Sequence, residues 1–345
     1  MSKQLKLGFQ IGYWGAQPPA NAPELLAEAE RLGFDSAWTA EAYGSDALTP
    51  LAWWGSQTSR IQLGTSIAQI AARTPTAMAM AALTMDHLSG GRFILGLGAS
   101  GPQVVEGWYG QPYPKPLART REYVEIIRKI LAREEPVTYD GEHYTLPYPG
   151  GTGLGKPVKS ITHPLRADLP IYLASEGPKN VALTAEIADG WLAIYYSPKI
   201  DGFYREALAE GFARPDARRS FDDFEVAATV PVIFHDDVEE AASFLRPVLA
   251  LYIGGMGAKD MNFHANVFSR MGYEGDAKKI QELYLDGKKE EAAAAVPMSL
   301  IEETSLIGPK EKIRDDLEAW RESCVTTILL YGDVATMRNM AELCL

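Results

Sequence analysis

Short apolar runs alternate with amphipathic segments along most of the chain. Continuous apolar runs of this length are typical of strands in a parallel sheet. They occur at residues 5–12, 36–39, 61–70, 93–97, 170–174, 191–195, 224–234 and 325–331. The segments between them carry an apolar stripe or many small residues and predict helices, as at 77–88 and 117–133. Eight strands in this even rhythm, without an internal repeat, favour one α/β (β/α)8 TIM barrel over the competing doubly wound open sheet.

Two segments interrupt this rhythm. Residues 137–146 predict a β-hairpin that turns at Asp140-Gly141, and the glycine- and proline-rich stretch 147–169 follows it. Residues 262–295 predict additional helices. We therefore expect a single barrel domain over residues 1–345, with insertions at about 135–169 and 255–300. Long irregular loops in compact domains often act as lids or binding loops.

Composition narrows the classes of partner. Of the 345 residues 46% are hydrophobic, which is enough for a globular core, and the net charge of −12 argues against nucleic acid or an anionic membrane as a partner. The two cysteines, Cys324 and Cys344, have no metal-ligand spacing and indicate a reducing, cytoplasmic setting. No apolar block has the length of a signal peptide or a membrane span.

The carboxyl ends of the predicted strands would converge on one face of a barrel. The residues expected there are mostly small or aromatic and carry little charge, which suits a flat, largely apolar ring system. They are Tyr13, Trp14, Glu41, Tyr43, Ser66 to Gln69, Ala99 to Gln103, Ala174 to Pro178, and Tyr195 to Ser197.

Gly177-Pro178-Lys179 has the composition of a helix start that could receive an anion. Backbone N–H groups at a helix N-terminus are unpaired and carry partial positive charge, so a phosphate is plausible there. An ordinary strand–helix turn accounts for the same residues equally well, and both interpretations stay open.

Two glycine motifs do not predict a nucleotide site. Gly150 to Lys156 spells GxxxxGK, but Pro157 replaces the required Ser or Thr and no strand precedes the motif. Gly96 to Gly101 spells GxGxxG, but Pro102 and the bulky residues after it fit a dinucleotide-binding helix poorly.

The candidate acid–base groups are few. Glu41 lies where a barrel places catalytic residues, although it could equally cap the next helix. His143 in the hairpin is a candidate acid or base, against the favoured interpretation of a surface histidine, and Glu176 is the third candidate. None of the five histidines is spaced as a metal ligand, so no metal is predicted; they are His87, His143, His163, His235 and His264.

Several motifs, spread over most of the chain, carry a family signal. They are LGFDSAW at 32–38, RIQLGT at 60–65, ARTP at 72–75, LSGGRFILGLG at 88–98, PIYLASEGP at 170–178 and ADGW at 188–191. With these motifs the chain resembles the luciferase-like monooxygenase superfamily, and within it the coenzyme F420-dependent oxidoreductases of the actinobacterial type. The combination of LSGGRFILGLG with ADGW is specific.

The resemblance implies a (β/α)8 barrel with insertions that binds the deazaflavin F420 at the carboxyl ends of the strands. It also implies a non-proline cis peptide bond at Ser66-Ile67 and a cofactor phosphate near Ser175 to Pro178. Together with the residues at the strand ends, the predicted cofactor-binding set is Tyr13, Trp14, Glu41, Thr65, Ser66, Ile67, Gln69, Ala99, Ser100, Gly101, Gln103, Ala174, Ser175, Glu176, Gly177 and Pro178.

The chain also departs from the family pattern. Some relatives have an Asp-His pair after the second strand and a Glu after the fourth, where this chain has Glu41-Ala42 and Gly101-Pro102-Gln103. The expected activity is hydride transfer between F420 and a small alcohol, carbonyl compound or activated alkene. An FMN-dependent monooxygenase and a cofactor-binding protein without turnover are the alternatives. We expect a homodimer with a small-molecule substrate.

Overall fold

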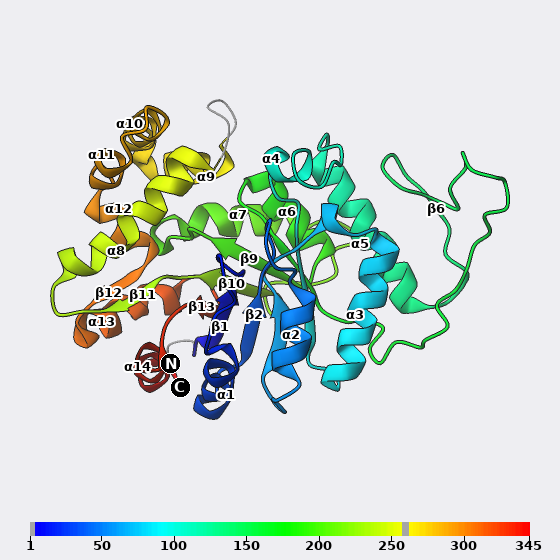
Figure 1. The fold of residues 1–345 in the computed structure, drawn as a ribbon, viewed down its shortest axis with the longest axis horizontal. Coiled ribbons are helices and arrows are strands. Elements are labelled where there is room, and N and C mark those ends of the chain that lie inside the picture. The colour runs from blue at the N-terminus through cyan, green and yellow to red at the C-terminus, as the bar shows by residue number, and fades with distance from the viewer. Residues whose placement is uncertain (1–3, 257–261) are drawn as a thin grey trace.

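The computed structural model describes residues 4–256 and 262–345. Its main sheet is parallel, with strand order β3-β2-β1-β13-β10-β9-β8-β5-β4, and pairing of β3 with β5 closes it into a barrel (Figure 1). The eight barrel strands are β1 (Lys6–Gly12), β2 (Ser36–Thr39), β3 (Gln62–Thr65), β5 (Phe93–Gly98), β8 (Ile171–Ala174), β9 (Gly190–Ile194), β10 (Glu225–Thr229) and β13 (Thr327–Leu330). The predicted barrel is confirmed.

Helices cover the outside of the barrel. They are α1 (Ala22–Leu32), α2 (Leu48–Gly55), α3 (Pro75–Ser89), α5 (Pro116–Ala132), α6 (Pro178–Ile187), α7 (Asp201–Phe212), α13 (Lys310–Glu322) and α14 (Val334–Cys344). Local chemistry sets their ends: Thr74 Oγ1 accepts a hydrogen bond from Ala77 N at the start of α3, and Pro75 occupies the first turn. The last helix, α14, packs beside α1.

Large side chains fill the barrel interior. The buried inner cluster is contributed by six different strands and consists of Trp38, Ile94, Tyr172, Leu192, Ala227 and Leu329. Trp38 fits because Gly64 on β3 has no side chain; a Cβ there would lie 2.3 Å from the indole ring. The interior is therefore a packed core, and only the carboxyl ends of the strands are left to form a site.

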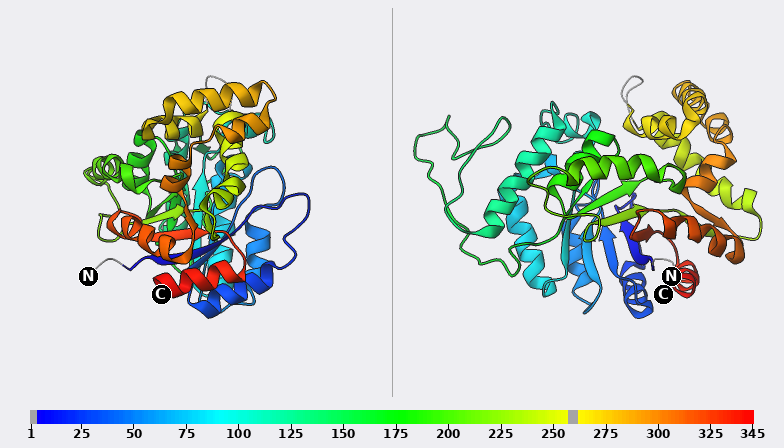
Figure 2. Two further views of the ribbon diagram at one scale, coloured as in Figure 1. Left: turned by 90° about the vertical axis from the view of Figure 1, so that its left-hand side faces the viewer. Right: turned by 180° about the vertical axis from the view of Figure 1, so that it is seen from behind.

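The first interruption of the barrel follows α5. Strands β6 (Tyr139–Asp140) and β7 (Thr145–Leu146) form the predicted antiparallel hairpin, which the carboxylate of Glu122 fixes by accepting bonds from three hairpin N–H groups. Residues 147–169 then extend away from the barrel as a long arm (Figures 1 and 2).

The second interruption is a group of helices between the short strands β11 (Val232–Phe234) and β12 (Leu306–Gly308). They are α8 (Val238–Ala250), a π-helical turn (Leu251–Gly255), α9 (Phe263–Phe268), a second π-helical turn (Ser269–Tyr273), α10 (Glu274–Leu285), α11 (Lys289–Ala294) and α12 (Met298–Thr304). We call this group the helical insertion. It has a hydrophobic core of its own, and α9 lies on the same side of the molecule as the short helix α4 (Pro102–Val105), which follows β5 (Figure 1).

The prediction of one strand over 224–234 is wrong in its length. The segment divides at Pro231 into β10 and β11 (Val232–Phe234), and β11 pairs with β12 (Leu306–Gly308) in a separate two-stranded sheet. Proline has no N–H to donate to a ladder, which explains the break. The sequence analysis missed β12 because three residues are too short for a periodic signal.

The predicted strand over 61–70 is also divided. β3 ends at Thr65, the two-residue strand β4 (Ala68–Gln69) resumes the pairing with β5, and a 3₁₀ turn (Ile70–Ala72) follows. The interruption coincides with a cis peptide bond between Ser66 and Ile67, which confirms the prediction for that bond. A further 3₁₀ turn (Pro198–Ile200) precedes α7.

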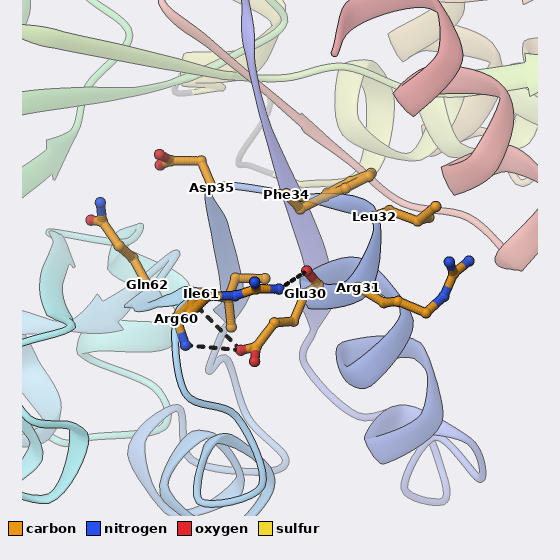
Figure 3. Close-up of a pocket in the computed structure, with 9 residues that line it drawn as sticks. Glu30, Arg31, Leu32, Phe34, Asp35, Arg60, Ile61 and Gln62 are labelled. Atoms are coloured by element: carbon orange, nitrogen blue, oxygen red, sulfur yellow. Dashed lines mark hydrogen bonds between the residues drawn. The ribbon is translucent and has the colours of Figure 1, made fainter.

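An open hollow lies at the amino ends of β2 and β3 (Figure 3). Glu30 fills part of it and accepts hydrogen bonds from the backbone N–H groups of Ser59, Arg60 and Ile61. This end of a barrel serves stability, so we do not interpret the hollow as the site. No helix among the described residues is both long and apolar enough to cross a membrane.

Candidate active site

Ile67 lies just beyond the carboxyl end of β3. Ile67 and Ala174 both pack against the inner barrel cluster, from opposite sides of β5 in the sheet order. Gly98 makes room for Ile67, because a Cβ on residue 98 would lie 2.7 Å from the Ile67 side chain. Among the predicted cofactor-binding residues, Ile67 and Ala174 therefore form one apolar surface. We call these two residues, together with the adjoining Ser66, the barrel ledge.

Gln10 on β1 adds a polar group to the barrel ledge that sequence analysis missed. Its Nε2 donates to Ser66 Oγ at 3.1 Å and faces Thr229 Oγ1 at 3.5 Å. The residue is 3% exposed, and its Oε1 is buried without a partner in the described part of the chain. The available signal was a lone amide within the apolar strand GFQIG.

Tyr13 and Trp14 follow β1 at the same end of the barrel. Trp14 packs its ring 6.1 Å from that of Trp54, and its backbone N–H donates to Ser45 Oγ. Its indole Nε1 is buried and has no acceptor within residues 4–256 and 262–345. Tyr13 is half exposed. Buried indole and amide groups normally have partners, so these orphans indicate a ligand-facing surface.

The carboxylate of Glu41 holds the loop after β2 in place through three hydrogen bonds. Its Oε1 accepts from Arg73 Nη1 and from the backbone N–H of Gln69, both at 2.7 Å, and its Oε2 accepts from Ala47 N at 3.1 Å. The side chain is nearly fully buried. Glu41 thus joins three segments around the site, and these contacts do not support a role as proton donor.

Three other predicted residues form hydrogen bonds that hold the strand ends and loops of the site together. Thr65 Oγ1 bridges to both the N–H and the C=O of Gly96, which ties β3 to β5. Gln69 donates through Nε2 to the carbonyl of Glu41 and holds the loop after β2. Ser175 accepts through Oγ from Thr184 and through its carbonyl from the indole of Trp191.

The loop after β5 lies at the predicted end of the barrel, but its residues differ in exposure. Ala99 and Gly101 are partly buried, and Ser100 has a left-handed φ of 58° while its carbonyl accepts from the Tyr113 hydroxyl. Gln103 is exposed on α4. Pro102 begins this one short turn because its ring suits a first helical position. The turn is only four residues long, so it does not conflict with the prediction that these residues fit a dinucleotide-binding helix poorly.

The start of α6 is open on its outer side. A Cβ at Gly177 would meet no atom within 4 Å, and Pro178 occupies the first helical turn. Arg270, from the helical insertion, reaches this loop and donates through Nη2 to the carbonyl of Glu176 at 2.9 Å. Its Nε is buried without a partner among the described residues. A free guanidinium donor beside an open helix N-terminus suits an anion.

His264 of α9 meets Glu176 at the same loop. Its Nδ1 lies 2.7 Å from Glu176 Oε1, although the two residues are far apart in the sequence. Tyr195 and Tyr252 lie against the imidazole ring, and burial raises the pKa of both phenols, so that they stay neutral at physiological pH. Sequence analysis treated His264 only as a histidine without metal spacing, and no local pattern marks the pair.

His143 is not brought to this site. Its ring Nδ1 lies 3.4 Å from Arg119 of α5, its backbone N–H donates to Glu122, and its Nε2 is buried without a partner in the described ranges. These contacts belong to the hairpin and α5. The role of His143 as acid or base stays a prediction that the contacts do not favour.

Comparisons with known proteins agree with this geometry. The sequence profile of the luciferase-like monooxygenases matches residues 6–327. A Mycobacterium tuberculosis protein, whose name assigns it provisionally to the coenzyme F420-dependent oxidoreductases, is 58% identical over 99% of this chain and 100% of its own length. The 5,10-methylenetetrahydromethanopterin reductase of Archaeoglobus fulgidus is 31% identical over 75% of this chain and 78% of its own.

A solved structure extends the likeness to three dimensions. The coenzyme F420-dependent tetrahydromethanopterin reductase of Methanopyrus kandleri superimposes with a TM-score of 0.78 and 26% identity, covering 98% of both chains. The profile match covers nearly the whole chain, and the barrel, the cis bond and the strand-end ledge are consistent with it. The protein therefore belongs to the luciferase-like monooxygenase family.

Proposed function

We propose that the protein is a coenzyme F420-dependent oxidoreductase that transfers hydride between the deazaflavin and a small alcohol, carbonyl compound or activated alkene. The observation that carries the proposal is the combination, at one end of the barrel, of an apolar ledge and an open helix start. The names of the relatives in Mycobacterium tuberculosis and Methanopyrus kandleri support F420 as the cofactor.

The residues present fit such a group. Ile67 and Ala174 offer an apolar surface for a flat ring, and the unpartnered amide oxygen of Gln10 could accept a hydrogen bond from its polar edge. The backbone at Gly177 to Lys179 and the free Nε of Arg270 would hold a phosphate. When bound, F420 would supply or accept the hydride at a ring carbon, and the chain would orient the partners and exclude water.

Cofactor binding is the first test. The purified protein is titrated with F420 and separately with FMN, and the cofactor fluorescence is followed. We expect micromolar binding of F420 and much weaker binding of FMN. Tight FMN binding together with oxygen consumption by reduced FMN would instead identify a monooxygenase.

Turnover is tested next with 2-propanol, cyclohexanone and 2-cyclohexen-1-one, by following F420 absorbance. For an oxidoreductase we expect the F420 absorbance to change with at least one of these substrates. Binding of F420 without any change would favour a cofactor-binding protein that has no turnover.

Arg270 provides a site-specific check. Because charge-assisted hydrogen bonds to phosphate are strong, Arg270→Ala should weaken F420 binding about 10-fold or more. The matched control is Arg314→Ala, since Arg314 is largely exposed on α13 and pairs with Asp315. If both variants bind F420 with equal affinity, Arg270 does not contribute to the cofactor site.

A further inference from the structure

Glu176 and His264 form a pair that the proposed cofactor contacts do not use. Nδ1 of His264 faces Oε1 of Glu176 at 2.7 Å, and side-chain exposure is only 21% for the histidine and 18% for the glutamate. The second carboxylate oxygen, Oε2, is buried without a partner among the described residues. His264 Nδ1 also lacks a hydrogen-bond partner there, so the pair is a close contact between a carboxylate and an imidazole and not an aligned hydrogen bond.

The imidazole is held in a fixed orientation. The rings of Tyr252 and Tyr195 pack edge-on against it, with centroids 5.0 Å and 5.8 Å away. Asn262 begins α9 by accepting from Ala265 N, and it also donates to the carbonyls of Tyr252 and Ile253. Tyr252 and the start of α9 are thus tied to the same turn of the helical insertion, while Tyr195 contacts the ring from the segment after β9.

The ionisable groups around His264 come from three other parts of the chain. The group that faces it from the β8–α6 loop is the carboxylate of Glu176, while Tyr195 after β9 and Tyr252 before α9 present neutral phenols. Arg270, on the turn that follows α9, donates through Nη2 to the carbonyl of Glu176, lies over the ring of Phe203 and brings a cation beside the pair. Because the carboxylate of Glu176 lies beside Nδ1, Nε2 is the ring nitrogen left to exchange a proton with a substrate.

Other acids near the strand ends are scarce in the part of the chain that the structure describes. Glu41 is bound to Arg73, and the loop after β5 carries Gly101, Pro102 and Gln103, none of which ionises. A reduction that adds hydride to carbon still needs a proton for the neighbouring atom. Tyr13 after β1 and Tyr331 after β13 add phenols at this end, and burial raises the pKa of Tyr331 to about 12. An imidazole beside the β8–α6 loop suits proton donation near neutral pH better, and His264 provides it.

We infer that His264 donates the proton that completes the reaction and that Glu176 positions it; the inference rests on the proposed function. Hydride from the reduced cofactor forms a C–H bond at the electrophilic carbon of a C=O or C=C group and breaks the π bond. The electron pair of the broken π bond then takes the proton from Nε2. It does so at the oxygen of a carbonyl group, or at the α-carbon of the enolate formed from an activated alkene. Water returns a proton to the imidazole. The cofactor is oxidised by two electrons and releases its own remaining proton to solvent.

The kinetic test uses 2-cyclohexen-1-one and reduced F420 with His264→Gln, His264→Ala and the control His235→Gln, whose histidine lies beside the start of α8. The rate of hydride transfer should fall about 100-fold in both His264 variants, while the dissociation constant for F420 changes less than about threefold. The wild-type rate should fall at alkaline pH, and this fall should be absent from both His264 variants. Added imidazole should restore rate to His264→Ala, and His235→Gln should match the wild type.

A second readout needs no cofactor. In the protein without F420, NMR of the labelled imidazole nitrogens should show that Glu176→Gln changes the chemical shift of His264 Nδ1 more than that of Nε2, because the carboxylate lies beside Nδ1. An unchanged Nδ1 resonance would overturn the pairing. Unchanged rates, a retained alkaline limb or absence of imidazole rescue would overturn the proton-donor role. If the wild type does not bind F420 or does not reduce any probe, the proposed function is wrong. The inference, which rests on that function, is then wrong as well.

Discussion

At the scale of single residues, the site separates side chains that hold the framework from side chains that face a ligand. Glu41, Thr65 and Ser175 each place their polar atoms on neighbouring protein groups. Gln10 and Arg270 each leave one buried polar atom without a protein partner among the described residues. Position at a strand end is thus not enough to assign a role, because loops at that end also need internal support.

Glu41 gives a direct test of this distinction. Removing one member of a buried ion pair leaves the other charge uncompensated, so Glu41→Gln should lower the free energy of unfolding by about 3 kcal/mol in urea titration. Asp46→Asn is the matched control: Asp46 is 3.7 Å from Arg73 and more exposed, and Asn can still cap α2, so we expect a loss under about 1 kcal/mol. Equal losses would contradict the structural role of Glu41.

At the scale of elements, the contact between β3 and β5 depends on glycine. Gly96 on β5 lies against the backbone of Thr65, whose hydroxyl bonds to both polar groups of Gly96. A Cβ on residue 96 would come 1.7 Å from the Thr65 carbonyl oxygen, which no side-chain rotation can relieve. This close approach brings the two strands together beside the cis bond, so it shapes the barrel ledge.

Gly96→Ala should therefore cost about 3 kcal/mol or more in the free energy of unfolding, or prevent soluble folding, because the backbone itself must move. Gly202→Ala is the control, since a Cβ at this helical position in α7 meets nothing within 4 Å. That change should stabilise by about 0.5–1 kcal/mol. Urea titrations of both variants measure the difference, and a mild effect of Gly96→Ala would show that the strands can separate there.

At the scale of the whole molecule, the arm at 147–169 presents apolar side chains to solvent. Ile161 is 93% exposed and Leu154 is 84% exposed, and Val158 and Tyr148 are exposed as well. Large apolar side chains concentrated on a projecting segment mark an interaction surface. We predict that a second copy of the chain covers them in a homodimer.

Light scattering after size-exclusion chromatography should accordingly give twice the mass of one chain. The double variant Leu154→Glu with Ile161→Glu should shift the protein to monomers, because charge would have to be buried at the contact. Thr152→Glu, an exposed polar position in the same arm, should leave the mass unchanged. A monomeric wild type would contradict the prediction.

The sequence by itself determined the architecture: eight apolar runs gave eight barrel strands, and the motif resemblance located the cis bond between Ser66 and Ile67. These features depend on local burial and backbone geometry, which leave periodic and motif signals. Only the tertiary structure decided that Glu41 forms an ion pair with Arg73 and that His264 lies beside Glu176. Such pairs form when an insertion docks on a distant loop, and one sequence carries no local pattern that records where it docks.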